Sequence, residues 1–325
     1  MKAIVQDIYG STDVLELRDL DKPAIGDDDV LVRVHAAGVD QGVWHLMTGL
    51  PYLVRVMGYG LRAPKTRVRG TEFAGRVEAV GANATRYQPG DEVFGICDGS
   101  FAEYARARAD KLAPKPANLS FEQAAAVPVS GCTALQGLRD KGNIAAGQRV
   151  LVIGAAGGVG TFAVQLAKAF GAEVTGVCST TKINLVRSIG ADRAIDYTRE
   201  DFADGAQRYD VIIDTAGNRS LSHLRRALAP RGTLVIVGGE GGGRWTGGFE
   251  RQILQAPLLS LFVGQKLRPL VSTERSEDLQ FLRRLIEAGK VTPVVDRILP
   301  LSQAREAIRH MREGRTGGKV VITVD

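Results

Sequence analysis

The stretch Arg149–Lys182 reads RVLVIGAAGGVGTFAVQLAKAFGAEVTGVCSTTK and predicts a strand, a tight turn, a helix and a second strand in succession. The apolar run at 150–153 is typical of a buried parallel strand, and apolar residues recur with a helical period from 162 to 170. A pyrophosphate can approach the N–H groups of that helix because the glycines carry no Cβ and the helix dipole favours negative charge. The stretch therefore predicts a dinucleotide-binding turn. The residues expected to contact the dinucleotide there are Gly154, Ala156, Gly157, Gly158, Val159 and Gly160.

The end of the second strand indicates which dinucleotide is bound. An NAD site usually places Asp or Glu there to hold the ribose 2′-hydroxyl, whereas this chain has Ser179, Thr180 and Lys182. Hydroxyls and a cation can bind a 2′-phosphate that a carboxylate would repel. Ser179 and Thr180 can also cap the helix that follows, and the two roles are compatible because both use the same geometry. We therefore predict NADP(H) rather than NAD(H).

Composition predicts a soluble cytoplasmic enzyme. The chain has 325 residues, enough for two domains, and 44% of them are hydrophobic, enough for a sizeable core. The N-terminal MKAIVQDIYG lacks the pattern of a secretory signal, and no apolar run approaches membrane-spanning length. Cys97, Cys132 and Cys178 lie far apart, which excludes a four-cysteine zinc lobe and favours a reducing compartment. We expect no membrane partner.

One segment of the chain is strongly basic. No acidic residue occurs from 41 to 71, and the basic segment 55–69 lies within that range. Its basic residues are Arg55, Arg62, Lys65, Arg67 and Arg69. A nucleic-acid or membrane surface is one interpretation, and a solvated loop that helps to attract an anionic cofactor is the other. Because neither an aromatic ladder nor an amphipathic helix accompanies the charges, we prefer the loop and expect no nucleic-acid partner.

The order of the expected elements divides the chain into three stretches. Residues 1–120 contain short strands separated by turns, which predicts a β-barrel-like domain. Residues 121–265 alternate helix and strand, which predicts a doubly wound parallel sheet with a last strand at 257–264, PLLSLFVG. Residues 266–325 contain two amphipathic helices, at 277–289 and 302–314, and a closing strand at 319–324.

Several motifs along the chain occur together in one superfamily. They are AAGVDQ at 36–41, RGTEFAGRVEAVG at 69–81, YQPGDEVFG at 87–95, TALQGL at 133–138, GAAGGVG at 154–160, GADRAIDY at 190–197 and GGKVVI at 317–322. With them the chain resembles the medium-chain dehydrogenase/reductase superfamily, and most closely its zinc-lacking quinone oxidoreductase (zeta-crystallin-like) branch. The resemblance implies an α/β protein with a GroES-like β-barrel catalytic domain of residues 1–120 and 266–325. It also implies a Rossmann NADP(H)-binding domain of residues 121–265.

The same resemblance predicts that no metal is bound. The positions of the zinc ligands in zinc-dependent members correspond here to Asp40, Thr71 and approximately Val129. Thr71 and Val129 are poor or impossible zinc ligands. Catalytic zinc needs about three protein ligands, and Asp40 with Glu72 does not reach that number.

Without zinc to stabilise an alkoxide, we predict NADPH-dependent reduction of quinones or of the C=C bond of α,β-unsaturated carbonyls by hydride transfer. The candidate catalytic residues are Asp40, His45 and Tyr52. His45 either supplies a proton or is a barrel histidine with no role. Tyr52, with Tyr59 as a substitute, lies near the position of a substrate-lining tyrosine in the quinone reductases, or fills a loop. The resemblance implies that Asp40 bonds the nicotinamide ribose.

Further cofactor contacts are expected where successive strands of the parallel sheet end, because ligands bind at that edge of open α/β sheets. The glycines among them can also be turn residues. These expected contacts are Tyr197, Asn218, Gly238, Gly239, Phe262 and Val263.

Two other functions stay open. One is a 2-enoyl thioester reductase, whose substrate phosphate the basic segment would bind. The other is a non-catalytic NADPH-binding protein with a basic face for a partner. By resemblance we also expect a homodimer formed through the edge strand predicted at 257–264.

Overall fold

The computed structural model describes residues 1–239, 243–248 and 255–324, and it divides into two compact units. Unit 1 comprises residues 1–132, 274–289 and 293–325, and unit 2 comprises residues 133–273 and 290–292. The sequence places the boundaries at 120 and 265, whereas the chain leaves unit 1 after Cys132 and returns to it at Glu274. Unit 1 extends beyond residue 120 because Phe121 stacks on His35, with ring centroids 4.3 Å apart.

Unit 1 is built on a seven-stranded sheet that joins the two ends of the chain. Its order is β14-β15-β3-β4-β5-β7, with β6 paired to β3, and β1 and β2 form a separate hairpin. The strands are β1 (Lys2–Val5), β2 (Glu16–Asp19), β3 (Asp29–Val39), β4 (Glu72–Val80), β5 (Glu92–Ile96), β6 (Tyr104–Arg108), β7 (Leu112–Pro114), β14 (Val295–Pro300) and β15 (Lys319–Thr323). Its helices are α1 (Gln41–Thr48), α2 (Tyr52–Val54), α3 (Phe121–Ala125), α9 (Ser276–Glu287) and α10 (Ala304–Arg312).

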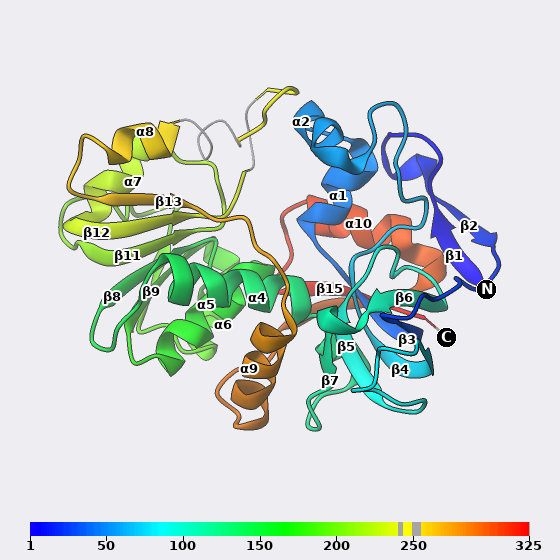
Figure 1. The fold of residues 1–325 in the computed structure, drawn as a ribbon. Coiled ribbons are helices and arrows are strands. Elements are labelled where there is room, and N and C mark those ends of the chain that lie inside the picture. The colour runs from blue at the N-terminus through cyan, green and yellow to red at the C-terminus, as the bar shows by residue number, and fades with distance from the viewer. Residues whose placement is uncertain (240–242, 249–254, 325) are drawn as a thin grey trace. The chain divides into compact units, whose positions relative to one another are not determined.

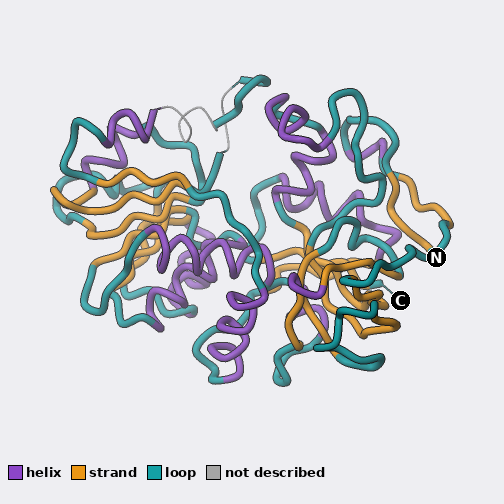
Figure 2. The backbone as a smooth tube through the Cα atoms, viewed as in Figure 1, coloured by secondary structure: helices purple, strands orange, loops and turns teal. Residues whose placement is uncertain are grey.

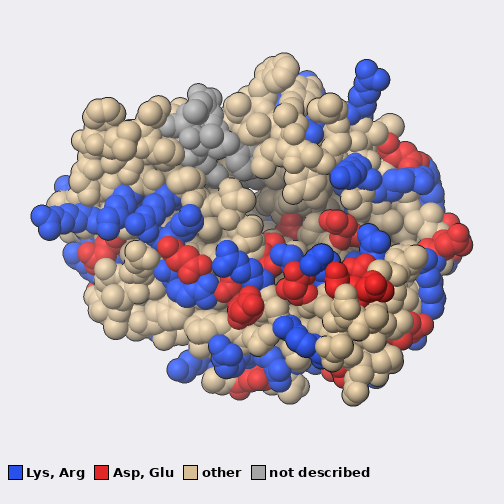
Figure 3. All heavy atoms as spheres, viewed as in Figure 1, with Lys and Arg blue, Asp and Glu red and all other residues tan. Residues whose placement is uncertain are grey.

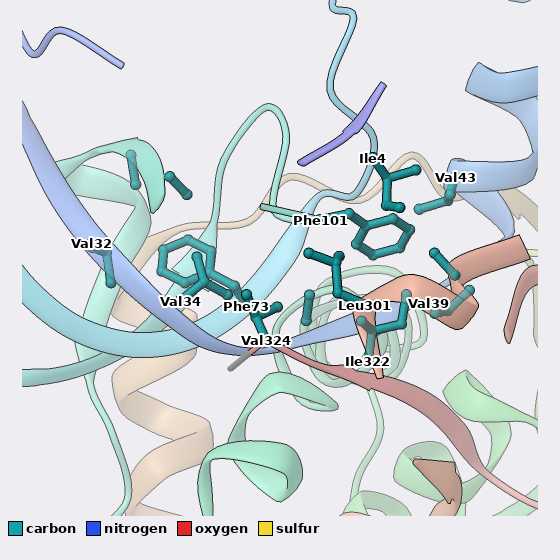
Figure 4. Close-up of a cluster of buried hydrophobic side chains, with 14 of the residues drawn as sticks. Ile4, Val32, Val34, Val39, Val43, Phe73, Phe101, Leu301, Ile322 and Val324 are labelled. Atoms are coloured by element: carbon teal, nitrogen blue, oxygen red, sulfur yellow. The ribbon is translucent and has the colours of Figure 1, made fainter. Parts of the chain in front are cut away.

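The core of unit 1 is apolar and is shared by segments far apart in the chain. Val32 and Val34 alternate along β3 and point into the core, as half-buried strands require. Ile322 of β15 pairs across the sheet with Ala37 of β3, and Leu301 joins the same cluster (Figure 4). The C-terminal segment is therefore an integral part of the first domain, because its apolar side chains complete that core.

Unit 2 is a doubly wound sheet whose six strands are all parallel, in the order β10-β9-β8-β11-β12-β13. The strands are β8 (Arg149–Ile153), β9 (Glu173–Cys178), β10 (Arg193–Asp196), β11 (Tyr209–Asp214), β12 (Leu228–Ile236) and β13 (Lys266–Pro269). The helices are α5 (Gly158–Ala169), α6 (Ile183–Ser188), α7 (Leu221–Ala227) and α8 (Ala256–Ser260), and α4 (Pro128–Gln136) leads in from unit 1. Helices α5 and α6 lie on one side of the strands and α7 and α8 on the other (Figures 1 and 2). The predicted fold class is confirmed.

One predicted strand is wrong. The run at 257–264 does not form a strand: helix α8 ends at Ser260, and the last strand of the sheet is β13. A short apolar run cannot be assigned to helix or strand from its periodicity, and Pro257 at the start of α8 suits a first helical turn. Phe262 and Val263 therefore follow a helix rather than a strand, and Phe262 is 84% exposed. The expectation that these two residues end a strand is therefore wrong, and their contact with the nicotinamide stays a prediction.

Across the described ranges, no helix is both long and apolar enough to cross a membrane. Positive and negative side chains are interspersed over the face shown in Figure 3.

Candidate functional site

The turn after β8 has the geometry that the glycine spacing predicts. Gly154 has a φ of +81°, a conformation that L side chains rarely adopt. A Cβ on Gly160 would lie 2.0 Å from the Gly154 carbonyl oxygen, so α5 can begin this close to the strand only with glycine there. Helix α5 has no side-chain cap, and a Cβ on Gly157 would meet only the Gly154 carbonyl oxygen, at 3.4 Å. The N–H groups of its first turn are therefore open to an anion such as a pyrophosphate.

Loops that follow neighbouring strands of unit 2 meet at this turn. The Thr215 hydroxyl, after β11, donates a hydrogen bond of 2.8 Å to the Ile153 carbonyl at the end of β8. The Gly238 N–H, after β12, donates one of 3.0 Å to the Asp214 carbonyl. Both loops lie at the carboxyl edge of the sheet, beside the point where the strand order reverses between β8 and β11. That edge is where open α/β sheets bind ligands.

The other residues expected to bind the cofactor follow the same strand ends. Tyr197 follows β10 directly and is 49% exposed. Asn218 is exposed after β11, and Gly239 follows β12. The structure thus brings these residues to one edge of the sheet, whereas Phe262 and Val263 follow helix α8 and do not end a strand.

At the end of β9 the structure adds a carboxylate that the sequence analysis did not consider. Ser179 precedes a short 3-10 turn at 180–182, but its side chain does not cap that turn. The Thr180 hydroxyl donates a hydrogen bond of 2.5 Å to Oδ2 of Asp196, at the end of β10. This bond and those from Thr198 lower the pKa of Asp196, so Asp196 is ionised at neutral pH. Thr180 therefore directs its proton to Asp196 and not toward a ligand.

Unit 1 holds a second group of polar residues, at the start of α1. The Asp40 side chain caps that helix, since its Oδ1 accepts the Val43 N–H at 3.1 Å. Its other oxygen accepts the Thr71 hydroxyl at 2.9 Å. Asp40 is 9% exposed, so its carboxylate is held in place by two bonds from its own unit.

The next residue on β4, Glu72, is fully buried and paired with a lysine. Its Oε1 forms an ion pair with the Lys319 ammonium, and its Oε2 accepts the Val129 N–H at 2.9 Å. Burial raises the pKa of Glu72 to about 7, and the Lys319 charge opposes that rise. A Cβ on Gly38 would lie 2.5 Å from Glu72 Oε1, so the glycine of the AAGV motif makes room for this carboxylate.

The donor set does not fit a catalytic zinc. Asp40 is committed to Val43 and Thr71, and Val129 contributes only a backbone N–H. Both Glu72 oxygens already have partners, the Lys319 ammonium and the Val129 N–H, and the buried ammonium would repel a divalent cation beside it. Within the described part of the chain, no three His, Cys, Asp or Glu side chains are placed to hold a metal ion.

The other two catalytic candidates have local partners. His45 Nδ1 lies 2.7 Å from the Leu50 carbonyl oxygen, so the proton on that nitrogen is donated to the backbone. The Tyr52 ring lies under the Arg55 guanidinium, 4.9 Å from its centroid. Tyr59 is 48% exposed and borders a pocket that also includes Thr71. The structure joins Asp40 to Thr71, and it places His45 beside the Leu50 carbonyl and Tyr52 beside Arg55.

The basic segment 55–69 is not a continuous positive face. Arg55 donates from Nε to the Gly49 carbonyl at 2.9 Å, and Arg67 pairs with Asp7 at 2.7 Å. Arg62 and Lys65 are exposed, whereas Arg69 is only 4% exposed.

Two basic residues of unit 1 were not singled out by the sequence analysis. Lys319 was only part of the GGKVVI motif, and Arg69 was grouped with the basic segment. Lys319 begins the apolar strand stretch KVVITV at 319–324, and Arg69 lies beside Val68 in VRGTEF at 68–73. A charge inside such a run is the signal that points to a buried partner or ligand.

Comparisons with known proteins agree with this architecture. Residues 26–117 match the family described as the alcohol dehydrogenase GroES-like domain, and residues 189–322 match the family described as zinc-binding dehydrogenase. The 2-methylene-furan-3-one reductase of Solanum lycopersicum is 34% identical over 99% of this chain and 79% of its own length. The chloroplastic NADPH-dependent alkenal/one oxidoreductase of Arabidopsis thaliana has the same identity and coverage. The structure of the quinone oxidoreductase from Coxiella burnetii is similar with a TM-score of 0.86 at 29% identity, over 100% of this chain and 99% of that one.

Proposed function

Because the chain belongs to the medium-chain dehydrogenase/reductase superfamily, in its quinone oxidoreductase-like branch, we propose that it is a zinc-independent, NADPH-dependent reductase of quinones or α,β-unsaturated carbonyls. The reaction adds a hydride to an electrophilic carbon and a proton to the product. Such an acceptor is already polarised, so the protein has to orient it and supply donors rather than a Lewis acid.

The observation that supports zinc independence is the set of side chains at the three positions that correspond to the zinc ligands. Asp40 accepts bonds from Val43 and Thr71, and Thr71 and Val129 carry no side chain suited to zinc. Asp40, His45 and Tyr52 remain the candidates for contact with the substrate or the nicotinamide ribose.

The preference for NADPH rests on the end of β9. Ser179 and Lys182 offer a hydroxyl and an ammonium to a 2′-phosphate, and a similar protein is named as NADPH-dependent. The Asp196 carboxylate, bonded to Thr180, acts against that preference. When bound, NADPH supplies the hydride.

The test of the reaction is an NADPH-oxidation assay with quinones, enals, enones and enoyl-CoA, with metal analysis of the same sample. We expect turnover of quinones or enones with no stoichiometric zinc. Turnover confined to enoyl-CoA would replace the proposal with a 2-enoyl thioester reductase. Tight NADPH binding with no turnover would favour a non-catalytic binding protein.

The test of the cofactor preference is Lys182→Ala. Loss of one charge-assisted hydrogen bond should raise KM for NADPH about tenfold and leave KM for NADH unchanged. Lys168→Ala is the matched control, since Lys168 is a lysine of the same unit that pairs with Asp192. An equal effect of Lys182→Ala on both cofactors would contradict the proposal.

We propose that the protein is a homodimer formed through the edge of unit 2. β13 is the edge strand, and the neighbouring Leu261 and Phe262 are 77% and 84% exposed. Unpaired strand edges and exposed apolar side chains both favour association. Light scattering should give twice the mass of the chain, and less for Phe262→Ser. The three cysteines are free, and the cytoplasmic location stays a prediction.

A further inference from the structure

A small pocket in unit 1 lies beside the Asp40–Thr71 bond. Its cavity volume is about 30 Å³. Thr71 is one of its wall residues, and Val43 and Leu46 of α1 are others, so it borders the helix that Asp40 caps. The pocket therefore adjoins one of the residues proposed to contact substrate or cofactor.

Arg69 lines this pocket and forms no ion pair with any described residue. The residue is 4% exposed, and its Nε is buried without a hydrogen-bond partner. Its guanidinium makes no ion pair or hydrogen bond with a described residue; only the backbone N–H and carbonyl of Arg69 are bonded, to Ile4 and Phe101. Burial lowers the pKa of Arg69 to about 10, which leaves the group charged at neutral pH.

The groups near Arg69 form no bond with its guanidinium. Asp98 lines the same pocket and its negative charge favours the ionised Arg69, but Asp98 is exposed and forms no ion pair with it. The Tyr9 hydroxyl donates its proton to backbone carbonyls, the nearer being that of Gly60 at 2.7 Å. A second polar atom without a partner, Ser100 Oγ, lies beside the pocket residue Gly70, where an added Cβ would be 2.3 Å from it. An unpaired buried charge is strongly unfavourable, so this arrangement suits an anion that arrives from outside.

We propose that Arg69 binds a carboxylate of the substrate, so that the preferred substrates are α,β-unsaturated carbonyl compounds that carry a carboxylate group. The statement about substrates rests on the proposed function. A guanidinium binds a carboxylate through two parallel hydrogen bonds. The cavity has space for roughly two water-sized groups, which matches the two oxygens of a carboxylate. Two ordered waters on Arg69 are the competing explanation.

The first experiment measures binding without turnover. Levulinate, a saturated keto acid that cannot be reduced at a C=C bond, is titrated into the full chain with and without NADP(H), and binding is followed by calorimetry or ligand-observed NMR. We expect wild type to bind it and Arg69→Gln to bind at least about tenfold more weakly. Arg67→Gln is the matched control, because Arg67 is two residues away, exposed and paired with Asp7. Arg69→Lys, which keeps the charge but not the two-bond fork, should be intermediate, and thermal unfolding checks that each variant folds.

The second experiment measures selectivity in turnover. Acetylacrylate, an enone with a carboxylate, is compared with its methyl ester as substrate. In Arg69→Gln, kcat/KM for the acid should fall by about ten- to a hundredfold while that for the ester stays within about threefold.

The outcomes separate the two proposals. Reduction of the ester with no preference for the acid, and no levulinate binding, would overturn the Arg69 proposal and leave the proposed function standing. Arg69-dependent levulinate binding with no reduction of any enone or quinone would overturn the proposed function and support carboxylate binding by Arg69. Equal levulinate binding by wild type and Arg69→Gln would show that the carboxylate does not bind at Arg69. The guanidinium would then be hydrated by the two waters alone.

Discussion

Two basic residues are buried in unit 1, and their surroundings differ. Lys319 is 2% exposed and Arg69 is 4% exposed. Lys319 forms an ion pair with the fully buried Glu72, whereas Arg69 faces a pocket and forms no ion pair with a described residue. Burial by itself does not tell a structural charge from a ligand-binding one. The partner does, because removing one member of a buried pair leaves the other uncompensated, whereas an unpaired buried charge is open to a ligand or to water.

The largest expected effect comes from breaking the paired charge. Lys319→Met leaves the Glu72 carboxylate buried without a counter-ion and should lower the free energy of unfolding by about 3–5 kcal/mol. Urea denaturation measures the loss. The double variant with Glu72→Gln should lose less, because no uncompensated charge remains. Equal losses in the single and double variants would mean that the pair is not coupled.

A smaller effect should follow from crowding the same pair. In Gly38→Ala the new Cβ would lie 2.5 Å from Glu72 Oε1 and 2.6 Å from the Ala125 carbonyl oxygen. Overpacking of this kind destabilises by about 1–3 kcal/mol. Gly137→Ala is the control, since its Cβ would have no neighbour closer than 3.5 Å. If both variants unfold at the same urea concentration, Gly38 is not needed for the carboxylate.

Removal of the unpaired charge of Arg69 should have the opposite effect and raise the stability. Arg69→Met replaces a buried charge with an apolar side chain and should stabilise the ligand-free protein by about 1 kcal/mol. The thermal midpoint should rise, while levulinate binding is lost. Arg67→Met, at an exposed position, should change neither the thermal midpoint nor levulinate binding. A lower midpoint in Arg69→Met would show that Arg69 has a structural role.

The paired charge should also make stability depend on pH. The pKa of Glu72 is raised from its ordinary value of 4.5 to about 7 by burial, so the folded protein holds this proton more tightly than the unfolded chain. Its contribution to stability is therefore present below pH 4.5 and is lost as the pH rises to about 7. The stability of wild type relative to Glu72→Gln should decrease across that window. A constant difference would contradict a raised pKa.

Much of the fold could be predicted from local sequence. The glycine turn at 154–160, the strands around it and the two C-terminal amphipathic helices form where their patterns indicate. The run at 257–264 was assigned wrongly because its apolar pattern suits a helix as well as a strand. The Thr180–Asp196 bond could not be predicted, since it joins the ends of two strands that become neighbours only in the sheet.

The sequence by itself determined the dinucleotide turn and the order of strands and helices, because a turn or a helix depends on residues within a few positions of one another. Only the tertiary structure decided that Lys319 meets Glu72, 247 residues earlier in the chain, and that Arg69 forms no ion pair with a described residue. Whether a buried charge is neutralised depends on atoms that distant segments bring within a few ångströms of it. Those segments are positioned by the packing of the whole core and not by the residues next to the charge.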